Sequence, residues 1–236
     1  MRALACLACL AATGCGRLGF GTVVAASDAT SGDASGDGDG PSAGVCPPTV
    51  VIDDDFEDGA VAPEWTALDG NNLTRAETGG FLQITFASNV PAGQVAGYQQ
   101  TVASDFTGTC VIAELAELPN PATLAQAEIR IGSSTDCAVV NFNGGQLHAA
   151  VHRGANITRL PDIAADLASQ RFVRLREVAG VWFFETSSDG THFVELGNTT
   201  KFASQVNTTL RLVAATGSGI NNGGELRFAS VRVFGP

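Results

Sequence analysis

The chain has 236 residues, of which 44% are hydrophobic and 16% charged, and its 13 cationic and 24 acidic side chains give a formal net charge of −11. This apolar fraction is enough to bury a core, which excludes a wholly disordered chain. The acidity argues against nucleic acids and anionic lipid surfaces as direct partners. A chain with 28 glycines and a single lysine is also unlike a coiled coil or a helical array.

The first 14 residues resemble the signal peptide of a bacterial lipoprotein. Arg2 precedes an apolar run that is too short to cross a bilayer as a helix. The run leads into Ala12-Thr13-Gly14-Cys15, which resembles a lipobox. The resemblance implies cleavage before Cys15 and lipid on this cysteine, and two or more acyl chains give a stable membrane anchor. An ordinary signal peptide cleaved near Ala25 is the alternative.

The residue after Cys15 bears on location. Gly16 stands where a retention aspartate would stand in an inner-membrane lipoprotein. The same resemblance therefore implies that the chain is held in the outer membrane of a bacterial cell envelope, facing either the periplasm or the cell surface.

Residues 15–44 are predicted to form a disordered tether that begins at the lipidated cysteine. From Ser27 to Gly44 the chain contains only Ser, Gly, Asp, Ala, Thr and Pro. This composition buries too little apolar surface to offset the entropy of the chain. A single folded domain is then expected over residues 45–236, where 11 Lys and Arg face 20 Asp and Glu, a net charge of −9.

This domain is predicted to be β structure almost throughout. Apolar and polar residues alternate over 82–86 and 127–131, which indicates half-buried strands. Turn signals such as Asn143-Gly144-Gly145 separate eleven or more such segments. One short helix is expected over 162–169, with Asp162 as its cap. So many short strands in one domain predict two packed sheets or a barrel.

Three stretches resemble concanavalin A-like jelly rolls of the laminin G type. Residues 171–196 resemble the hairpins of the back sheet in those domains, with an aromatic strand before Ser188-Asp189-Gly190. Residues 53–65 resemble their opening, and 210–233 resemble their last two strands. The resemblance implies an all-β, two-sheet antiparallel sandwich. Pairing of the two terminal strands would close an edge of that sandwich.

Glucanases on this fold carry paired carboxylates at alternate positions of one strand, which points acid and nucleophile into one cleft. Glu114 and Glu117 are an odd number of residues apart and so face opposite sides. Glu128 has Arg130, rather than an acid, two residues later. No strand offers an aligned pair, so we predict no catalytic residues, although acids distant in sequence can still converge. A glycoside hydrolase stays the alternative function.

Two metal sites were considered. Clustered acidic side chains suit calcium, and the densest cluster consists of Asp53, Asp54, Asp55 and Asp58. A structural calcium ion is the only cofactor predicted, and solvated loop acids are the alternative. His148 and His152 share one face of a strand, with His192 or Asp162 as a third ligand, but a polar outer face of a half-buried strand is the favoured interpretation.

Sugar binding needs aromatic faces and polar side chains for hydroxyl groups. Trp65 and Trp182 are expected in the core, so the predicted contacts are other residues that lie next to turns or in an expected loop. They are Tyr98, Gln99, Asn141, Asn143 and Gln146.

Cys46, Cys110 and Cys137 belong to the folded domain, and an exported chain favours one disulfide among them. Cys110 and Cys137 lie in successive β segments and are the pairing we expect. Cys46 at the start of the domain is the alternative partner.

The sequence therefore predicts a non-catalytic lipoprotein that displays a jelly-roll binding module, with glycans or envelope proteins as partners. A structural or adhesion protein without a small ligand is a further alternative, because the fold alone does not determine function.

Overall fold

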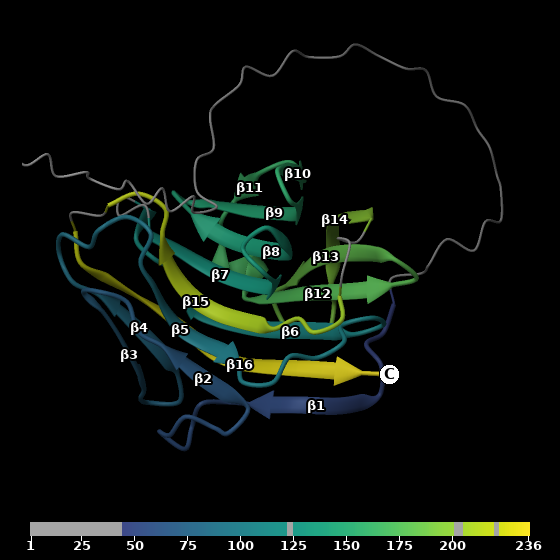
Figure 1. Ribbon diagram of the computed structural model, residues 1–236, viewed down its shortest axis with the longest axis horizontal. Helices are drawn as coiled ribbons and strands as arrows, with labels where there is room; N and C mark the ends of the chain where they lie inside the picture. The colour runs from purple at the N-terminus through teal and green to yellow at the C-terminus, as the bar shows by residue number, and fades with distance from the viewer. Residues whose placement is uncertain (1–43, 122–124, 201–204, 220–221) are drawn as a thin grey trace, which may run out of the picture.

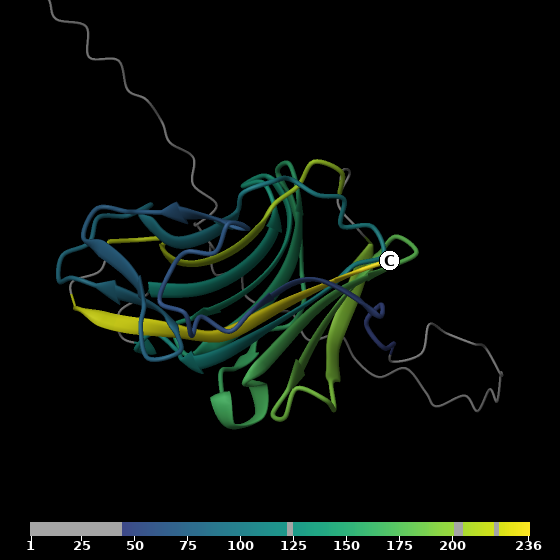
Figure 2. The same cartoon turned by 90° about the horizontal axis from the view of Figure 1, so that it is seen from below.

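The computed structural model of the chain describes residues 44–121, 125–200, 205–219 and 222–236. The predicted signal peptide, Cys15 and nearly all of the tether lie outside these residues. The domain consists of two antiparallel sheets packed face to face (Figure 1). Figure 2 shows the strands of both sheets curving rather than lying flat. The prediction of an all-β, two-sheet sandwich is confirmed.

The sheet that contains residues 172–200 is called the back sheet here. Its strand order is β14-β13-β12-β6-β16-β4-β3, and β1 pairs with β16. The bounds of its strands are β1 Thr49–Asp54, β3 Leu73–Glu77, β4 Leu82–Phe86, β6 Cys110–Glu117, β12 Phe172–Val178, β13 Val181–Ser187, β14 Val194–Thr200 and β16 Gly224–Gly235.

The other sheet is called the front sheet. Its strand order is β10-β9-β8-β7-β15-β5-β2, and β11 pairs with β9. The bounds of its strands are β2 Trp65–Leu68, β5 Val95–Gln100, β7 Ala125–Gly132, β8 Asp136–Asn143, β9 Gln146–Arg153, β10 Asn156–Arg159, β11 Ile163–Ala164 and β15 Leu210–Thr216.

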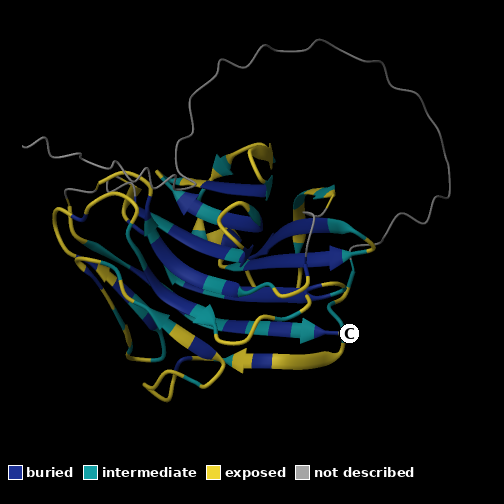
Figure 3. Ribbon diagram, in the orientation of Figure 1, coloured by how far each residue is buried: buried dark blue, intermediate teal, exposed yellow. Residues whose placement is uncertain are grey.

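Alternation along the strands places the core between the sheets. In β7, Ala127, Ile129 and Ile131 are buried in the main apolar cluster, whereas Glu128 and Arg130 point to the opposite side. Trp182 of β13 is fully buried and Trp65 is nearly so, as expected. Figure 3 shows the central strands buried along most of their length, while the edge strands β1 and β14 are largely exposed.

The two terminal strands pair with each other, as the resemblance implied. Thr49 lies opposite Gly235, and the pairing continues to Asp54 opposite Val231. The 12-residue β16 also pairs with β4 and β6, so it holds three strands of the back sheet together (Figure 1). Closing this edge leaves fewer unpaired backbone groups for association with other chains.

The disulfide joins Cys46 to Cys110, with Cα atoms 5.4 Å apart, so the prediction of a Cys110–Cys137 bond is wrong. The reason is sheet assignment. Cys110 begins β6 of the back sheet, whereas Cys137 lies in β8 of the front sheet and packs with Val139 and Ala150 on the side away from the core. The thickness of the sandwich separates the two cysteines.

The helix is shorter and starts later than the sequence predicts. The helix α1 covers Leu167–Gln170, and its cap is Asp166, whose carboxylate accepts a hydrogen bond from the Ala168 amide at 3.0 Å. Residues 163–164 instead extend along β9 as β11. Among the described residues, no helix has the length and apolar character needed to span a membrane.

Candidate functional site

The side of the front sheet that faces away from the core, called here the front face, gathers polar side chains from five strands. Glu128 of β7 lies opposite Asn141 of β8, which lies opposite His148 of β9. In the neighbouring row, Arg130 lies opposite Arg211 of β15. Gln99 of β5 follows Arg211 in the same row. Antiparallel pairing thus brings together residues that are far apart in the sequence.

Four of the five predicted sugar contacts lie on this face. Asn141 and Asn143 are on one strand and point to one side, and Asn143 pairs with Gln146 across the β8–β9 hairpin. Gln99 lies directly opposite Arg211, in the row that also contains Arg130 and is called here the arginine row. The sequence placed these residues near turns, and the register places them on one surface.

Tyr98 does not belong to this face, and its interpretation as an exposed residue is wrong. It lies on β5 rather than in a loop, is fully buried, and stacks on Trp65 with ring centroids 6.1 Å apart. Its hydroxyl donates a hydrogen bond to Glu77 at 2.5 Å. Burial, followed by the Glu77 carboxylate, raises the pKa of Tyr98. Alternation along β5 sends Tyr98 inward and Gln99 outward.

The centre of the front face holds a buried carboxylate beside two arginines. Glu128 is 4% exposed, and its carboxylate lies 2.7 Å from the Arg130 guanidinium. Burial raises the pKa of Glu128, and the charges of Arg130 and Arg211 oppose that rise. Burial and the nearby Arg130 charge together lower the pKa of Arg211. Arg130 therefore pairs with this carboxylate, whereas Arg211 acts on it only through its charge.

A second ionic group lies at the β9 edge of the face. Asp162 accepts a hydrogen bond from Arg159 at 2.7 Å and lies 2.7 Å from His148 Nδ1. Burial raises the pKa of Asp162, but the hydrogen bonds from His148 and Arg159 outweigh it and leave the pKa lowered. Burial, helped by the charge of Arg130, lowers the pKa of His152. His148 is thus held by an ion-pair network.

Two amide oxygens on the face have no partner among the residues that the structure describes. The Oδ1 atoms of Asn141 and Asn143 are buried and accept no hydrogen bond from these residues. A buried acceptor that is left unpaired costs about 1–3 kcal/mol. A ligand that supplies hydroxyl or amide donors at β8 would remove this cost.

Neither of the two metal sites considered from the sequence is seen in the part of the chain that the structure describes. In residues 44–121, 125–200, 205–219 and 222–236, no group of three or more His, Cys, Asp or Glu side chains is placed to hold a metal ion. His192, the third ligand considered for His148 and His152, instead lies 2.7 Å from Asp189 after β13.

The four aspartates considered for calcium serve other purposes. Asp54 accepts a hydrogen bond from the Trp65 indole at 2.7 Å, and burial raises its pKa. Asp55 and Asp58 accept hydrogen bonds from backbone amides two residues further on, and Asp53 is exposed. The carboxylates of Asp54, Asp55 and Asp58 thus accept hydrogen bonds from groups of the chain after β1.

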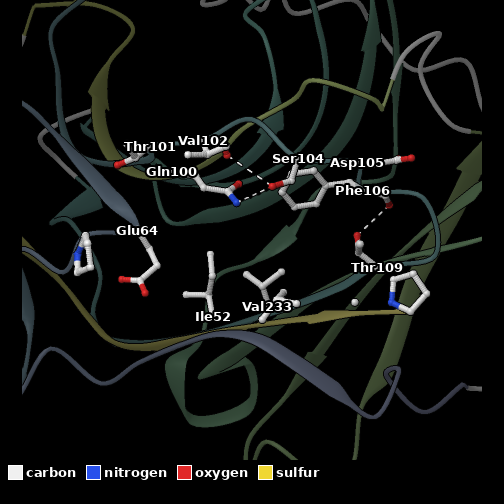
Figure 4. A pocket seen from close by; sticks show the side chains of 14 residues that line it. Ile52, Glu64, Gln100, Thr101, Val102, Ser104, Asp105, Phe106, Thr109 and Val233 are labelled. Carbon is white, nitrogen blue, oxygen red and sulfur yellow. Dashed lines mark hydrogen bonds between the residues drawn. The ribbon is translucent and has the colours of Figure 1, made fainter.

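A separate cavity of about 520 Å³ lies where β1 and the end of β16 face the chain after β5 (Figure 4). Ile52, Val233 and Phe106 give it an apolar lining, and Gln100 donates a hydrogen bond to Ser104 at 2.9 Å on its polar side. None of the predicted sugar contacts lines this cavity.

No family model and no curated protein matches the chain. Solved structures do match. A mutant of the GH43 protein BlXynB from Bacillus licheniformis has a TM-score of 0.58 at 14% identity, and the match covers 78% of this chain and 39% of that one. A β-1,3-1,4-glucanase (lichenase) from a mouse hindgut metagenome has a TM-score of 0.57 at 11% identity, and the match covers 79% of this chain and 99% of that one. The exoplasmic domain of VIP36, in a form bound to Ca²⁺ and Man3GlcNAc, has a TM-score of 0.54 at 10% identity, and the match covers 74% of this chain and 84% of that one.

The likeness shows a jelly-roll sandwich of two antiparallel sheets, which is consistent with a concanavalin A-like fold. At these identities the likeness extends to the fold alone, and the chain spans about two fifths of the length of the first of these proteins. The residues of the front face therefore carry the functional argument.

The arginine row, in which Arg130 lies opposite Arg211, is not among the features predicted from the sequence. Glu128 and Arg130 were considered only as a departure from a catalytic motif, and Arg211 was not considered. The sequence does contain a signal for Arg211. It is the one charged residue among the apolar residues of 210–214, and this pattern indicates a side chain that points away from the core.

Proposed function

We propose that the front face binds carbohydrate and that the chain is a non-catalytic glycan-binding module. The observation that carries this proposal is the pair of buried, unpartnered Oδ1 atoms of Asn141 and Asn143. Sugar hydroxyl groups are donors that satisfy such acceptors, and carbohydrate sites commonly combine amide side chains with charged ones. Two of the matched structures are a glucanase and a Man3GlcNAc complex, which supports the same ligand class.

The test is a glycan array of the full chain, followed by calorimetric titration of the glycans that bind. Asn141→Ala and Asn143→Ala are each expected to weaken binding about fivefold to tenfold, the effect of one or two lost hydrogen bonds. Asn198→Ala is the matched control, because Asn198 lies on β14 of the back sheet. Absence of binding to any glycan, or equal losses in all three variants, would contradict the proposal. A structural or adhesion role would then be favoured.

A glycoside hydrolase is the second candidate, favoured by one observation. Burial raises the pKa of Glu128, while hydrogen bonds lower that of Asp162, and both residues project from the same side of the front sheet. Glycosidases use two carboxyl groups whose pKa values are shifted apart by their surroundings. Release of reducing ends that disappears in Glu128→Gln would support an enzyme. Binding without release supports the module.

We further propose that lipid on Cys15 and the tether over 15–44 hold the laminin G-type domain away from the outer membrane. The support is the lipobox-like sequence and the low-complexity composition of these residues. Labelled palmitate should be incorporated by cells that express the chain and not by cells that express Cys15→Ala. Incorporation into both, or into neither, would contradict the lipid anchor.

A further inference from the structure

The front face carries more positive than negative charge, although the domain as a whole is acidic. Arg130, Arg159 and Arg211 lie on this face, and among the described residues their acidic neighbours there are Glu128 and Asp162. The face therefore has a local excess of positive charge, whereas residues 45–236 carry a net charge of −9.

Arg211 is the group that this arrangement leaves unsatisfied. Its Nε atom is buried without a hydrogen-bond partner, and within the described residues its guanidinium forms no ion pair. Asp162 is already held by Arg159 and His148, and Glu128 lies against Arg130. A partly buried guanidinium without an ion-pair partner loses hydration, and the charge of nearby Glu128 offsets only part of that loss.

The register makes the position of Arg211 still less favourable. Arg211 lies directly opposite Arg130 on the neighbouring strand, and like charges at opposed positions of an antiparallel pair repel each other. Glu128 lies opposite Val213 instead, one row away. The pKa of Arg211 is lowered by burial and then by the charge of Arg130. An anion bound between the two arginines would relieve the repulsion and supply the missing partner.

The neighbouring side chains indicate what kind of anion fits. Gln99 lies beside Arg211 in the same row, and Asn141 lies beside Glu128 in the next row. An anionic group next to amide side chains corresponds to a sugar that carries both charge and hydroxyl groups. The planar guanidinium fork matches the two oxygens of a carboxylate and those of a sulfate ester.

We infer that the front face selects acidic glycans, in which a uronate carboxylate or a sulfate ester binds between Arg211 and Arg130. This inference rests on the proposed function and deepens it, because it names the class of sugar. It assigns Arg211 as the residue that distinguishes acidic from neutral glycans.

The test uses the full chain and pairs of glycans that differ only in charge. Polygalacturonate and its methyl-esterified form test the carboxylate, and chondroitin sulfate and its desulfated form test the sulfate. Calorimetry should give an affinity about tenfold or more higher for the charged member of at least one pair. The pair that shows the preference identifies the anion.

Three variants locate the effect. Arg211→Gln should reduce the preference to about twofold or less, and Arg211→Lys should retain part of it because it keeps the charge but loses the fork. Arg232→Gln is the matched control, since it removes one positive charge from the other side of the sandwich, on β16 of the back sheet. It should leave the preference unchanged. Circular dichroism melting checks that each variant is folded.

The outcomes separate the two proposals. Equal binding of charged and neutral glycans, weakened by Asn141→Ala but not by Arg211→Gln, would overturn this inference and leave the proposed function standing. Binding of single-stranded DNA with the same dependence on Arg211 would overturn it in favour of a general polyanion site. Absence of glycan binding would overturn both proposals.

Discussion

The two sheets carry the same three charged groups on their outward sides, arranged differently. On the back sheet, Arg174 and Arg176 both donate to Glu185, and all three residues are buried. On the front sheet, Glu128 pairs with Arg130, and Arg211 forms no ion pair within the described residues. The first group is satisfied by the protein itself. The second has one charge that the fold does not neutralise.

Strand register causes this difference. Arg174 and Arg176 lie on one strand, β12, and Arg174 lies directly opposite Glu185 of β13. Both guanidinium groups also lie over aromatic rings, with Arg174 4.0 Å from the ring centroid of Phe193. Arg211 of β15 instead lies opposite Arg130. A structural cluster and a binding cluster can therefore contain the same number of charges. They differ in whether each charged side chain has a partner within the protein.

The largest expected effect is on the back sheet. Glu185→Gln leaves two buried arginines without their shared carboxylate, and removing one partner of a buried ion pair costs about 3–5 kcal/mol of the free energy of unfolding. Arg211→Gln removes an unpaired charge and should cost nothing or stabilise the fold. Urea denaturation of both variants measures this contrast. Equal losses of stability would refute the distinction between the two groups.

The disulfide should affect stability without affecting the front face. Cys46→Ser opens a loop with a sequence separation of 64 residues, and the loss of such a bond costs about 2–4 kcal/mol. Glycan affinity should stay unchanged, because Cys110 belongs to the back sheet. Thermal unfolding and calorimetry check the two halves of this prediction. The Cys46–Cys110 pairing would be wrong if Cys137→Ala removed the disulfide from a non-reducing peptide map.

A smaller effect is expected from Glu128→Gln on the front sheet. Arg130 loses its carboxylate, which should cost about 1–3 kcal/mol of the free energy of unfolding because a buried charge is left unpaired. The front face then carries one more net positive charge, so its affinity for acidic glycans should rise. Denaturation and titration of the same variant measure both changes. A fall in that affinity would show that Glu128 itself contacts the sugar.

The smallest effect concerns Glu77, which lies on neither outward side. Burial, together with the neighbouring Asp58, raises the pKa of Glu77, although its hydrogen bond with Tyr98 opposes the rise. A raised pKa in the folded state means that the carboxyl group favours folding at acidic pH, and that this contribution is lost as pH rises through the folded pKa.

Glu77→Gln keeps an acceptor for Tyr98 and removes the titration. Its melting temperature should therefore fall less than that of the wild-type chain between pH 4.5 and pH 8. Glu64→Gln is the control, because it removes one exposed carboxylate. Parallel pH profiles for the wild-type chain and Glu77→Gln would disprove the role of Glu77.

The architecture could be predicted from the sequence because it depends on alternation within single strands. The 127–131 segment and the aromatic β13 identified their inward sides without knowledge of their neighbours. Tyr98 was misplaced because Gly97 and Gln100 obscure the alternation of β5. Its strand was therefore taken for a loop.

Features that depend on neighbouring strands could not be predicted. The disulfide partner of Cys110 follows from which sheet each cysteine joins. The position of Arg211 opposite Arg130 becomes apparent only when β15 pairs with β7, and these strands are far apart in the sequence. The amide residues were proposed from turn signals, and the register that unites them on one face comes from the pairing of whole strands.

A crystal structure of the full chain with an oligogalacturonate or a sulfated oligosaccharide tests the central claim most directly. We predict a sugar on the front face, with its anionic group within hydrogen-bond distance of Arg211 and a hydroxyl group donating to Asn141 or Asn143. A sugar bound instead in the cavity between β1 and the chain after β5 would contradict the account.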